Sequence, residues 1–174
     1  EREAAGRRGA LRIAVPHKEI CFTDGACGAV RQELAAQCGD FIVRRSDGVF
    51  AYQLAVVVDD ARMGVTEVVR GRDLLASTPR QIFLQQALGL ATPEYFHTPL
   101  LVNGQGVRLS KRDGALDFGA LRRKFTPRQL LGRLAALAGL LPTPESISLQ
   151  TLTALFSWPA VHSADIAVPE EWFL

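Results

Sequence analysis

The segment between residues 52 and 102 switches repeatedly between strand-like and helix-like patterns, and this alternation constrains the fold more than any other feature. Val65–Arg70 has the composition of a strand and is closed by Gly71. Thr78-Pro79 then supplies the N-cap and first position of a helix that we expect to reach Gly89. Phe96–Val102 is again extended. Strands and helices in this order predict an α/β domain with a helical extension.

Tyr52–Asp60, read YQLAVVVDD, is compatible with two structures. Three consecutive valines favour a strand. The spacing of Leu54, Val57 and Ala61 instead favours one face of a helix, which Gly64 would end. The residues alone leave this choice open. A complete doubly wound nucleotide-binding fold needs more strands than the chain offers, so the pattern fits one half of such a domain.

A second Thr-Pro pair, Thr126-Pro127, predicts another helix, which Pro142-Thr143-Pro144 ends. The tail from Ser146 contains further helical stretches. The apolar residues of the helix repeat on one face, which we expect to lie in the core: Leu130, Leu131, Leu134, Leu137, Ala138 and Leu141.

The residues before position 52 predict short elements, and residues 1–10 look like a charged lead. We expect a strand at Leu11–Val15, a turn-rich segment at Cys21–Gly28, a short helix at Arg31–Cys38 and a strand at Phe41–Arg44 with a turn after it.

Composition bounds the function only weakly. With 48% hydrophobic residues among 174, the chain can bury a core of ordinary size. A net charge of +2 does not by itself indicate a nucleic-acid-binding protein. An RNA-facing surface would have to come from local basic clusters, each equally compatible with a solvated face: Arg7/Arg8/Arg12, Arg44/Arg45 and Arg122/Arg123/Lys124/Arg128.

The cysteines Cys21, Cys27 and Cys38 are odd in number and form no C-x-x-C pair, so we expect reduced thiols of a cytoplasmic protein. Neither a zinc site nor another metal site is predicted. No apolar run reaches the ~18 residues of a membrane helix. The first residues lack the apolar stretch of a signal peptide, and the missing initiator Met suggests a chain that begins inside a longer product.

The most informative motif lies in Val102–Gly114, read VNGQGVRLSKRDG. Its centre, Arg108-Leu109-Ser110-Lys111-Arg112, is a basic loop with one hydroxyl. Such a loop can place a lysine ammonium, a hydroxyl and backbone N–H groups against a polyphosphate. The chain has no P-loop, and Gly104-Gln105-Gly106 is too short for a dinucleotide-binding fingerprint.

Other positions carry candidate ligand groups. Arg70 ends a predicted strand, where α/β domains bind ligands, and its guanidinium can hold a carboxylate while Tyr52 adds a phenol. Asp59 and Asp60 would point about 100° apart on a helix, so they do not easily share one metal. These carboxylates and His97 are either contacts to RNA or ligand, or structural groups. No Ser-His-Asp or Cys-His arrangement can be assembled, so covalent catalysis is not expected.

Two runs resemble the class I glutamyl-tRNA synthetase group. They are FAYQLAVVVDDARMGVTEVVRGRDLLASTPRQIFL (Phe50–Leu84) and HTPLLVNGQGVRLSKRDGA (His97–Ala115). The phrase DGVFAYQLAVVVDD is most similar to a short subfamily without an anticodon-binding domain, whose members glutamylate queuosine in tRNA(Asp). The resemblance covers roughly residues 11–141 and implies that Tyr52–Arg62 is helical.

This resemblance assigns roles to single residues. Tyr52 and Arg70 match the family's glutamate-contacting tyrosine and arginine. Arg108–Arg112 corresponds to the KMSKS-type signature, in which Lys111 contacts ATP. Leu109 and Arg112 are expected to help bind ATP, and Arg108 and Ser110 are expected to do so and to assist Lys111 in catalysis. A lysine loop that closes over the phosphates stabilises their developing negative charge without acting as a nucleophile.

The family's reaction has two steps. L-Glutamate and ATP, with Mg²⁺ as the usual counter-ion, give glutamyl-adenylate and pyrophosphate. Glutamate is then transferred, in the subfamily, to queuosine at the wobble position of tRNA(Asp). The resemblance implies a cytoplasmic enzyme that is monomeric when full length and has no contact with membranes.

The sequence also departs from the family. It contains no HIGH-type signature, and its cysteines do not match the spacing of the zinc site that many members carry. We therefore expect the second half of the enzyme, which alone would bind ATP weakly and not aminoacylate. Residues 1–40 would end the connecting insertion, 41–103 would form the second half of the Rossmann-like catalytic domain, and 104–174 would hold the signature loop and a helical region of the stem-contact type.

Two alternatives stay open. One is a fragment of a standard glutamyl-tRNA synthetase, which charges tRNA(Glu) at its 3′ end. The other is a non-catalytic RNA-binding module derived from a synthetase. The missing first half favours that module, whereas the intact Tyr52, Arg70 and Lys111 argue against it.

Overall fold

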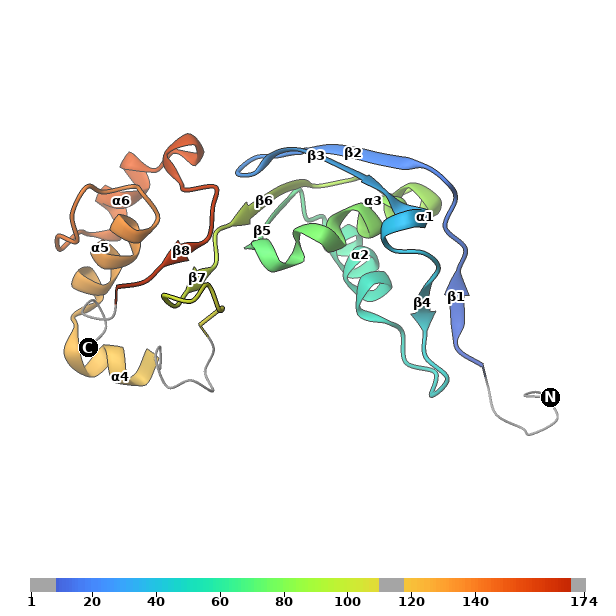
Figure 1. The fold of residues 1–174 in the computed structure, drawn as a ribbon, viewed down its shortest axis with the longest axis horizontal. Coiled ribbons are helices and arrows are strands. Elements are labelled where there is room, and N and C mark those ends of the chain that lie inside the picture. The colour runs from blue at the N-terminus through green and yellow to red at the C-terminus, as the bar shows by residue number, and fades with distance from the viewer. Residues whose placement is uncertain (1–8, 110–117, 170–174) are drawn as a thin grey trace. The chain divides into compact units, whose positions relative to one another are not determined.

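The computed structural model describes residues 9–109 and 118–169 (Figure 1). The chain forms two compact units. Unit 1 consists of Glu1–Arg70 and Leu74–Phe96, and unit 2 consists of Gly71–Asp73 and His97–Leu174. The chain thus crosses between the units after Arg70, after Asp73 and after Phe96.

The described part of unit 1 before residue 52 forms two antiparallel strand pairs. In the first, β1 (Leu11–Ile13) pairs with β4 (Phe41–Arg44), and the register shifts by one residue between Leu11 and Arg12, which leaves Val43 of β4 without a partner in β1. In the second, β2 (Glu19–Asp24) and β3 (Gly28–Glu33) form a hairpin that lies against helix α3, described below (Figure 1). The strands expected around residues 11–15 and 41–44 are therefore present.

The β2–β3 hairpin corrects part of two predictions. The turn expected within Cys21–Gly28 is present at residues 25–27, but Cys21–Asp24 is the end of β2, and the helix expected at Arg31–Cys38 is reduced to α1 (Leu34–Gln37). The pattern does not predict the end of β2 because Asp24, which is only 2% exposed, interrupts the apolar alternation of the inward-facing residues. Its Oδ1 atom accepts hydrogen bonds from the backbone N–H groups of Ala26 and Cys27, which closes the turn.

Helix α2 (Tyr52–Met63) confirms the helical interpretation of the valine-rich segment. It ends at Gly64, whose φ of 69° is the left-handed conformation that glycine adopts most easily. Val57 is buried in one cluster with Phe41 and Val43 of β4. Burial of this helix face, together with the glycine stop, outweighs the strand propensity of the three valines.

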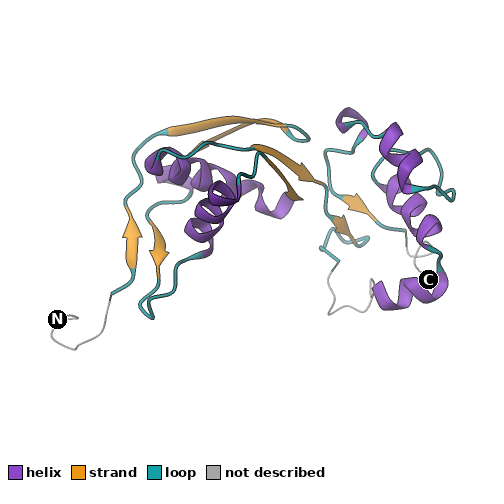
Figure 2. Ribbon diagram, turned by 180° about the vertical axis from the view of Figure 1, so that it is seen from behind, coloured by secondary structure: helices purple, strands orange, loops and turns teal. Residues whose placement is uncertain are grey.

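Strand β5 (Glu67–Gly71) and helix α3 (Thr78–Leu88) confirm the predicted strand and helix, and a 3₁₀ helix, η1 (Arg72–Ser77), lies between them. Strand β6 (Glu94–Thr98) pairs with β5. Figure 2 shows α2 and α3 side by side, in agreement with their packing contacts. Two residues of α3 connect the two cores of the unit: Ile82 packs with Ile20, Leu34 and Tyr95, and Leu84 packs with Phe41, Val43 and Val57.

Unit 2 begins with β7 (Leu101–Val102), which pairs in parallel with β8 (Ile166–Ala167) near the end of the described chain. The described residues between them form α4 (Phe118–Lys124), α5 (Pro127–Leu137), α6 (Leu149–Leu155) and the 3₁₀ helix η3 (Trp158–Ala160). The C-terminal segment is tied back by Arg72, which donates a hydrogen bond to the Ser163 carbonyl at 2.5 Å, and by Asp165, which accepts one from the Leu100 N–H at 3.1 Å.

Helix α5 begins where its Thr-Pro signal predicts. The Thr126 hydroxyl accepts a hydrogen bond from the Gln129 N–H, and the Gln129 side chain accepts one from the Thr126 N–H, which makes a capping box. Leu130, Leu137 and Leu141 are buried as expected, whereas Leu134 is 41% exposed. The close approach on this helix occurs at Gly132, where a Cβ atom would overlap the carbonyl oxygen of Glu145.

Candidate functional site

A guanidinium held in a fixed direction forms the centre of the candidate site in unit 1. Arg70 lies near the end of β5, and its Nη2 atom donates hydrogen bonds to Thr78 Oγ1 at 2.9 Å and to Gln81 Oε1 at 2.7 Å. Its guanidinium carbon lies 5.2 Å from the centre of the Tyr95 ring, within the range of a cation–π contact. The side chain is therefore clamped between helix α3 and strand β6.

Electrostatics place two predicted ligand residues near this guanidinium. Partial burial lowers the pKa of Arg70, and four acidic groups act in the opposite direction: Tyr95, Tyr52, Asp60 and Asp24. Tyr52 and Asp60 thus lie within electrostatic range of Arg70. Tyr52 is the first residue of α2 and is 55% exposed, so its phenol is open to an incoming ligand.

The clamp continues into helix α3 through buried amides. Gln81, which is 1% exposed, also donates from Nε2 to Gln53 Oε1 of α2 at 2.8 Å. Gln85, which is 2% exposed, donates to the Tyr95 hydroxyl at 2.9 Å. Burial raises the pKa of Tyr95, and its hydrogen bond to Gln85 and the charge of Arg70 oppose that rise. The network links α2, α3, β5 and β6 around one cation.

The two adjacent carboxylates differ in their surroundings, as a helix requires. Asp59 is exposed, whereas Asp60 is half-buried and lines a cavity of about 290 Å³ near the C-terminal ends of α2 and α3. Gln85 lines the same cavity, and its Oε1 atom is buried without a hydrogen-bond partner. Asp60 therefore belongs to the side of α2 that faces Arg70, and Asp59 does not.

His97, on β6, is only 1% exposed. A buried imidazole has little surface to offer a macromolecule, so of the two roles considered for this residue its burial favours the structural one.

The start of the basic loop lies in unit 2 and is held by side-chain and backbone contacts. Arg108 pairs with Val102 across a tight turn, in which Asn103 Oδ1 accepts hydrogen bonds from the N–H groups of Gln105 and Val107. Arg108 Nη1 lies 2.5 Å from Asp73 Oδ2. Leu109 is held by a backbone hydrogen bond to Leu101. The remaining predicted ATP-binding residues, Ser110, Lys111 and Arg112, lie outside the described residues.

Within residues 9–109 and 118–169, no three histidine, cysteine or acidic side chains are close enough to hold a metal ion. None of the three cysteines, all of which lie in the described residues, forms a disulfide bond. A hydrogen bond with Glu19 raises the pKa of Cys21, so this exposed thiol is held in its protonated, less nucleophilic form. In the same described part of the chain, no helix is long and apolar enough to cross a membrane.

Sequence reasoning missed four members of the Arg70 network: Gln53, Gln81, Gln85 and Tyr95. One signal was available. Thr78, Gln81 and Gln85 follow each other at spacings of three and four, so they form a polar stripe along a helix that also carries core residues. A polar stripe buried on a helix implies fixed partners, because unpaired buried amides are costly.

A family model described as tRNA synthetases class I (E and Q), catalytic domain, matches residues 1–162. The chain belongs to this family. The match confirms the resemblance that was read from the two runs around Tyr52 and Lys111, and it agrees with the α/β pattern of strands and helices in unit 1.

Among curated relatives of the class I (E and Q) family, proteins named glutamyl-Q tRNA(Asp) synthetase are similar over nearly the whole chain. The protein of Symbiobacterium thermophilum is 47% identical over 171 residues, which cover 98% of this chain and 53% of that protein. One from Neisseria meningitidis serogroup C is 46% identical over 157 residues, with 90% and 51% covered. The chain spans about half the length of the curated relatives it matches.

Two solved structures share the fold. A glutamate tRNA ligase from Elizabethkingia meningosepticum, solved in complex with its amino acid, has a TM-score of 0.78 at 25% identity, with 94% of this chain and 36% of that chain covered. A glutamate-tRNA synthetase from Elizabethkingia anophelis has a TM-score of 0.76 at 24% identity, covering 91% of this chain and 36% of its own. The class I catalytic fold therefore accounts for nearly all of this chain.

Proposed function

We propose that this chain contributes the glutamate-binding and signature-loop part of an enzyme that activates L-glutamate with ATP and transfers it to queuosine at the wobble position of tRNA(Asp). The relatives that match 90% or more of the chain at 46–47% identity carry the name glutamyl-Q tRNA(Asp) synthetase. This support comes from overall similarity, and the geometry of Arg70 supplies an independent chemical reason.

The observation that carries the proposal is the arrangement of Arg70. A guanidinium with two of its hydrogen bonds fixed by neutral oxygens, at 2.9 and 2.7 Å, is held ready to bind a carboxylate in the plane of its fork. Tyr52 is exposed nearby and can donate its phenol O–H to the same ligand. An amino acid with a side-chain carboxylate fits such a pair.

We assign the binding of ATP to the basic loop. In this proposal Arg108 and the neighbouring residues Leu109, Ser110, Lys111 and Arg112 hold the phosphates. Arg108 is exposed and shares its charge with Asp73, so a triphosphate would compete with that carboxylate for the guanidinium. Because the described residues offer no cluster of metal ligands, Mg²⁺ would enter with the phosphates of ATP.

The proposed role of each part of the chain is based on the resemblance to the same family. Residues 1–40 are proposed to end the connecting insertion, 41–103 to complete the Rossmann-like half-domain, and 104–174 to include a helical region that contacts the stem of tRNA. Helix α4 supports the last assignment, because Arg122, Arg123 and Lys124 are exposed in its last turn. Clustered cations on one helix end suit the phosphates of an RNA stem.

A chimera tests the proposal directly. This chain replaces the matching 53% of the Symbiobacterium thermophilum relative, so that the remainder of that protein supplies what these 174 residues do not contain. ATP–pyrophosphate exchange with L-glutamate then measures activation, and transfer of labelled glutamate to queuosine-containing tRNA(Asp) measures the second step. We expect both steps in the chimera, and neither in the 174 residues alone, which contain no HIGH-type sequence.

Three substrates separate the alternatives. Glutamylation of tRNA(Asp) that depends on queuosine supports the proposal. Charging of tRNA(Glu) at its 3′ end would instead identify a standard glutamyl-tRNA synthetase. Binding of tRNA that neither ATP nor glutamate affects, with no pyrophosphate exchange, would leave an RNA-binding module. The chimera with Arg62→Gln is a matched control, because Arg62 is an exposed arginine in the last turn of α2 and, two positions after Asp60, lies on a different face of the helix.

A further inference from the structure

The outer face of the β1–β4 sheet in unit 1 carries an unusual set of exposed side chains. Cross-strand partners share a face of a sheet, and Arg44 is paired with Leu11 on one side and with Phe50 on the other. Arg12 is paired with Ile42. All five side chains are exposed, and we call this set the Arg44 face: Leu11, Arg12, Ile42, Arg44 and Phe50.

The buried residues of β4 show which of its side chains face outward. Phe41 and Val43 point into the core and are 8% and 7% exposed, so the alternation of β4 turns Ile42 and Arg44 outward. Phe50 is 60% exposed. Most large aromatic side chains are buried in folded proteins, so a ring presented beside two arginines is the feature of this face that needs an explanation.

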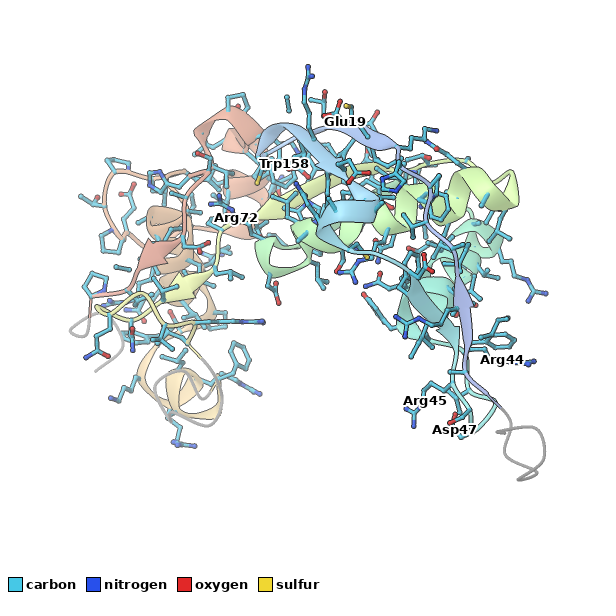
Figure 3. The ribbon with its side chains drawn as sticks, turned by 45° about the vertical axis from the view of Figure 1, so that its right-hand side comes forward. Glu19, Arg44, Arg45, Asp47, Arg72 and Trp158 are labelled. Carbon is cyan, nitrogen blue, oxygen red and sulfur yellow. The ribbon has the colours of Figure 1, made fainter. Side chains whose placement is uncertain are left out.

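The charges of the face are available to a ligand. Within the described residues, no carboxylate forms an ion pair with Arg44. Arg12 donates a hydrogen bond from one Nη atom to the Asp40 backbone carbonyl at 2.6 Å. This bond fixes the side chain but does not neutralise its charge, because the acceptor is a neutral carbonyl oxygen. Arg45 differs, because it pairs with Asp47 at 2.7 Å, and Figure 3 shows the side chains of Arg44 and Arg45 on opposite sides of the chain at the end of β4.

We propose that the Arg44 face binds a single-stranded loop of an RNA, with Phe50 stacked on a base and the guanidinium groups of Arg12 and Arg44 on the flanking phosphates. Single-stranded nucleic acids are bound in this way, by aromatic platforms next to cationic side chains. A duplex offers phosphates but no free base to stack, so the exposed ring selects for a loop.

This inference rests on the proposed function for the identity of the RNA. Phe50 and Tyr52 are separated by one residue, and their Cα atoms are thus at most about 7 Å apart. Because Tyr52 is proposed to contact glutamate, a loop held on the Arg44 face would be bound beside the amino acid that must be transferred to it. The inference goes beyond the proposed function, because it assigns RNA contact to the strands of unit 1.

Binding measurements on the 174-residue chain test the face. Fluorescence anisotropy gives Kd across a series of salt concentrations for two labelled RNAs: the anticodon stem–loop of tRNA(Asp), and the same stem as a blunt duplex. We expect the stem–loop to bind at least about fivefold more tightly, the lower end of the contribution of one stacked base. Phe50→Leu keeps the ring's apolar volume without its flat surface, and should remove this preference with little change in the affinity for the duplex.

The arginines are tested by the salt dependence. Arg44→Gln should reduce the slope of log Kd against log salt by about 0.7 to 0.9, the value for one lost phosphate contact. Arg45→Gln is the matched control, because it removes the same charge from the neighbouring position, whose side chain lies on the other side of the chain. It should leave the slope unchanged. Circular dichroism establishes that each variant is folded. Equal effects of Arg44→Gln and Arg45→Gln, or an unchanged loop preference in Phe50→Leu, would overturn the inference.

The outcomes also separate this inference from the proposed function. If the chimera fails to glutamylate tRNA(Asp) while Phe50→Leu and Arg44→Gln change RNA binding as expected, the Arg44 face stands and the enzymatic proposal fails. If the chimera is active and both variants bind like the wild type, the enzymatic proposal stands and RNA is bound elsewhere.

Discussion

Helices α3 and α5 begin with the same Thr-Pro pair, and the structure uses the two threonines differently. Thr126 stands outside α5 and caps it, with its hydroxyl bonded to the Gln129 N–H. Thr78 is the first residue of α3, is completely buried, and accepts a hydrogen bond from Arg70. The cap position of α3 falls to Ser77, which makes no capping hydrogen bond. One threonine stabilises its helix, whereas the other orients the guanidinium of Arg70, which is the proposed glutamate-binding cation.

The buried faces of the two helices also differ, because the buried face of α5 is apolar and that of α3 is partly polar. Helix α5 buries Leu130, Ala135 and Leu137, and its glycine lets the chain at Glu145 approach closely. Helix α3 buries Thr78, Gln81 and Gln85 beside its apolar residues. Buried amides contribute little net stability, but they fix the geometry of their partners. The comparison therefore predicts that substitutions in α3 act on activity, and that substitutions in α5 act on stability.

The largest expected effect is at the cation itself. Arg70→Gln in the chimera should lower kcat/KM for glutamate in pyrophosphate exchange by about 30- to 5,000-fold, which corresponds to the loss of about 2–5 kcal/mol for a charged pair that has lost one partner. Arg70→Lys should recover only part of this loss, because an ammonium cannot form the planar two-bond contact. An activity within about twofold of the parent chimera would mean that Arg70 does not bind glutamate.

The next effect concerns the stability of unit 2. In an ordinary helix, Gly→Ala is stabilising by up to about 1 kcal/mol. Gly132→Ala should have the opposite sign and cost about 1–3 kcal/mol, because the added methyl group overlaps the Glu145 carbonyl and either the helix or the loop must move. Thermal unfolding followed by circular dichroism measures the change. Gly104→Ala is the control, since nothing lies within 4 Å of a Cβ atom at that position.

The sequence predicted helix α5 better than it predicted the role of Thr78, and the reason is physical. Caps and apolar periodicity are local, so Thr126, Pro127 and the leucines suffice to place α5. The partner of Thr78 is Arg70, which lies on a different element and comes within hydrogen-bond distance only after the chain has folded. The helix was correctly placed, but Thr78, expected at the N-cap, is one residue inside it.

The same argument explains the remaining differences. The residues of Tyr52–Asp60 leave helix and strand open, because three valines favour a strand while the apolar spacing and Gly64 favour a helix; packing against β4 and the family resemblance both support the helix. Asp24 hid the end of β2, since a buried carboxylate follows no apolar pattern. Arg70 and Tyr52 were named as ligand residues from strand position and resemblance. Gln81 and Tyr95, which hold Arg70, became evident only from the tertiary contacts.

The two threonines allow the comparison to be tested with one substitution at two sites. Thr126→Val removes the cap and should cost about 1 kcal/mol of unfolding free energy with no change in KM for glutamate. Thr78→Val keeps the buried volume but removes an acceptor of Arg70, and should raise the KM for glutamate in the chimera by about two- to tenfold. Equal effects of the two variants on KM would contradict the division of roles between the two helices.

The smallest expected effect is the pH dependence of Tyr95, which contacts Arg70 from strand β6. The chain has two tyrosines, so Tyr52→Phe leaves Tyr95 as its one phenol, whose ionisation can be followed by ultraviolet absorbance. Burial raises the pKa of Tyr95, so its midpoint should lie above the ordinary value of about 10. Because Arg70 acts against this rise, Arg70→Gln in the same background should move the midpoint further upward.

The stability of that variant should follow the same shift. When the folded pKa is raised, the contribution of Tyr95 to stability is fully present below about pH 10, where the phenol is neutral in both states. As the pH rises past this value, the unfolded chain loses its phenol proton first, so the free energy of unfolding should decrease until Tyr95 ionises in the folded protein as well. Urea unfolding of the Tyr52→Phe variant with and without Tyr95→Phe isolates this contribution from other titrating groups. A difference between the two that is independent of pH above 10 would show that Tyr95 is not buried under Arg70 in solution, and that α3 does not hold its cation against β6.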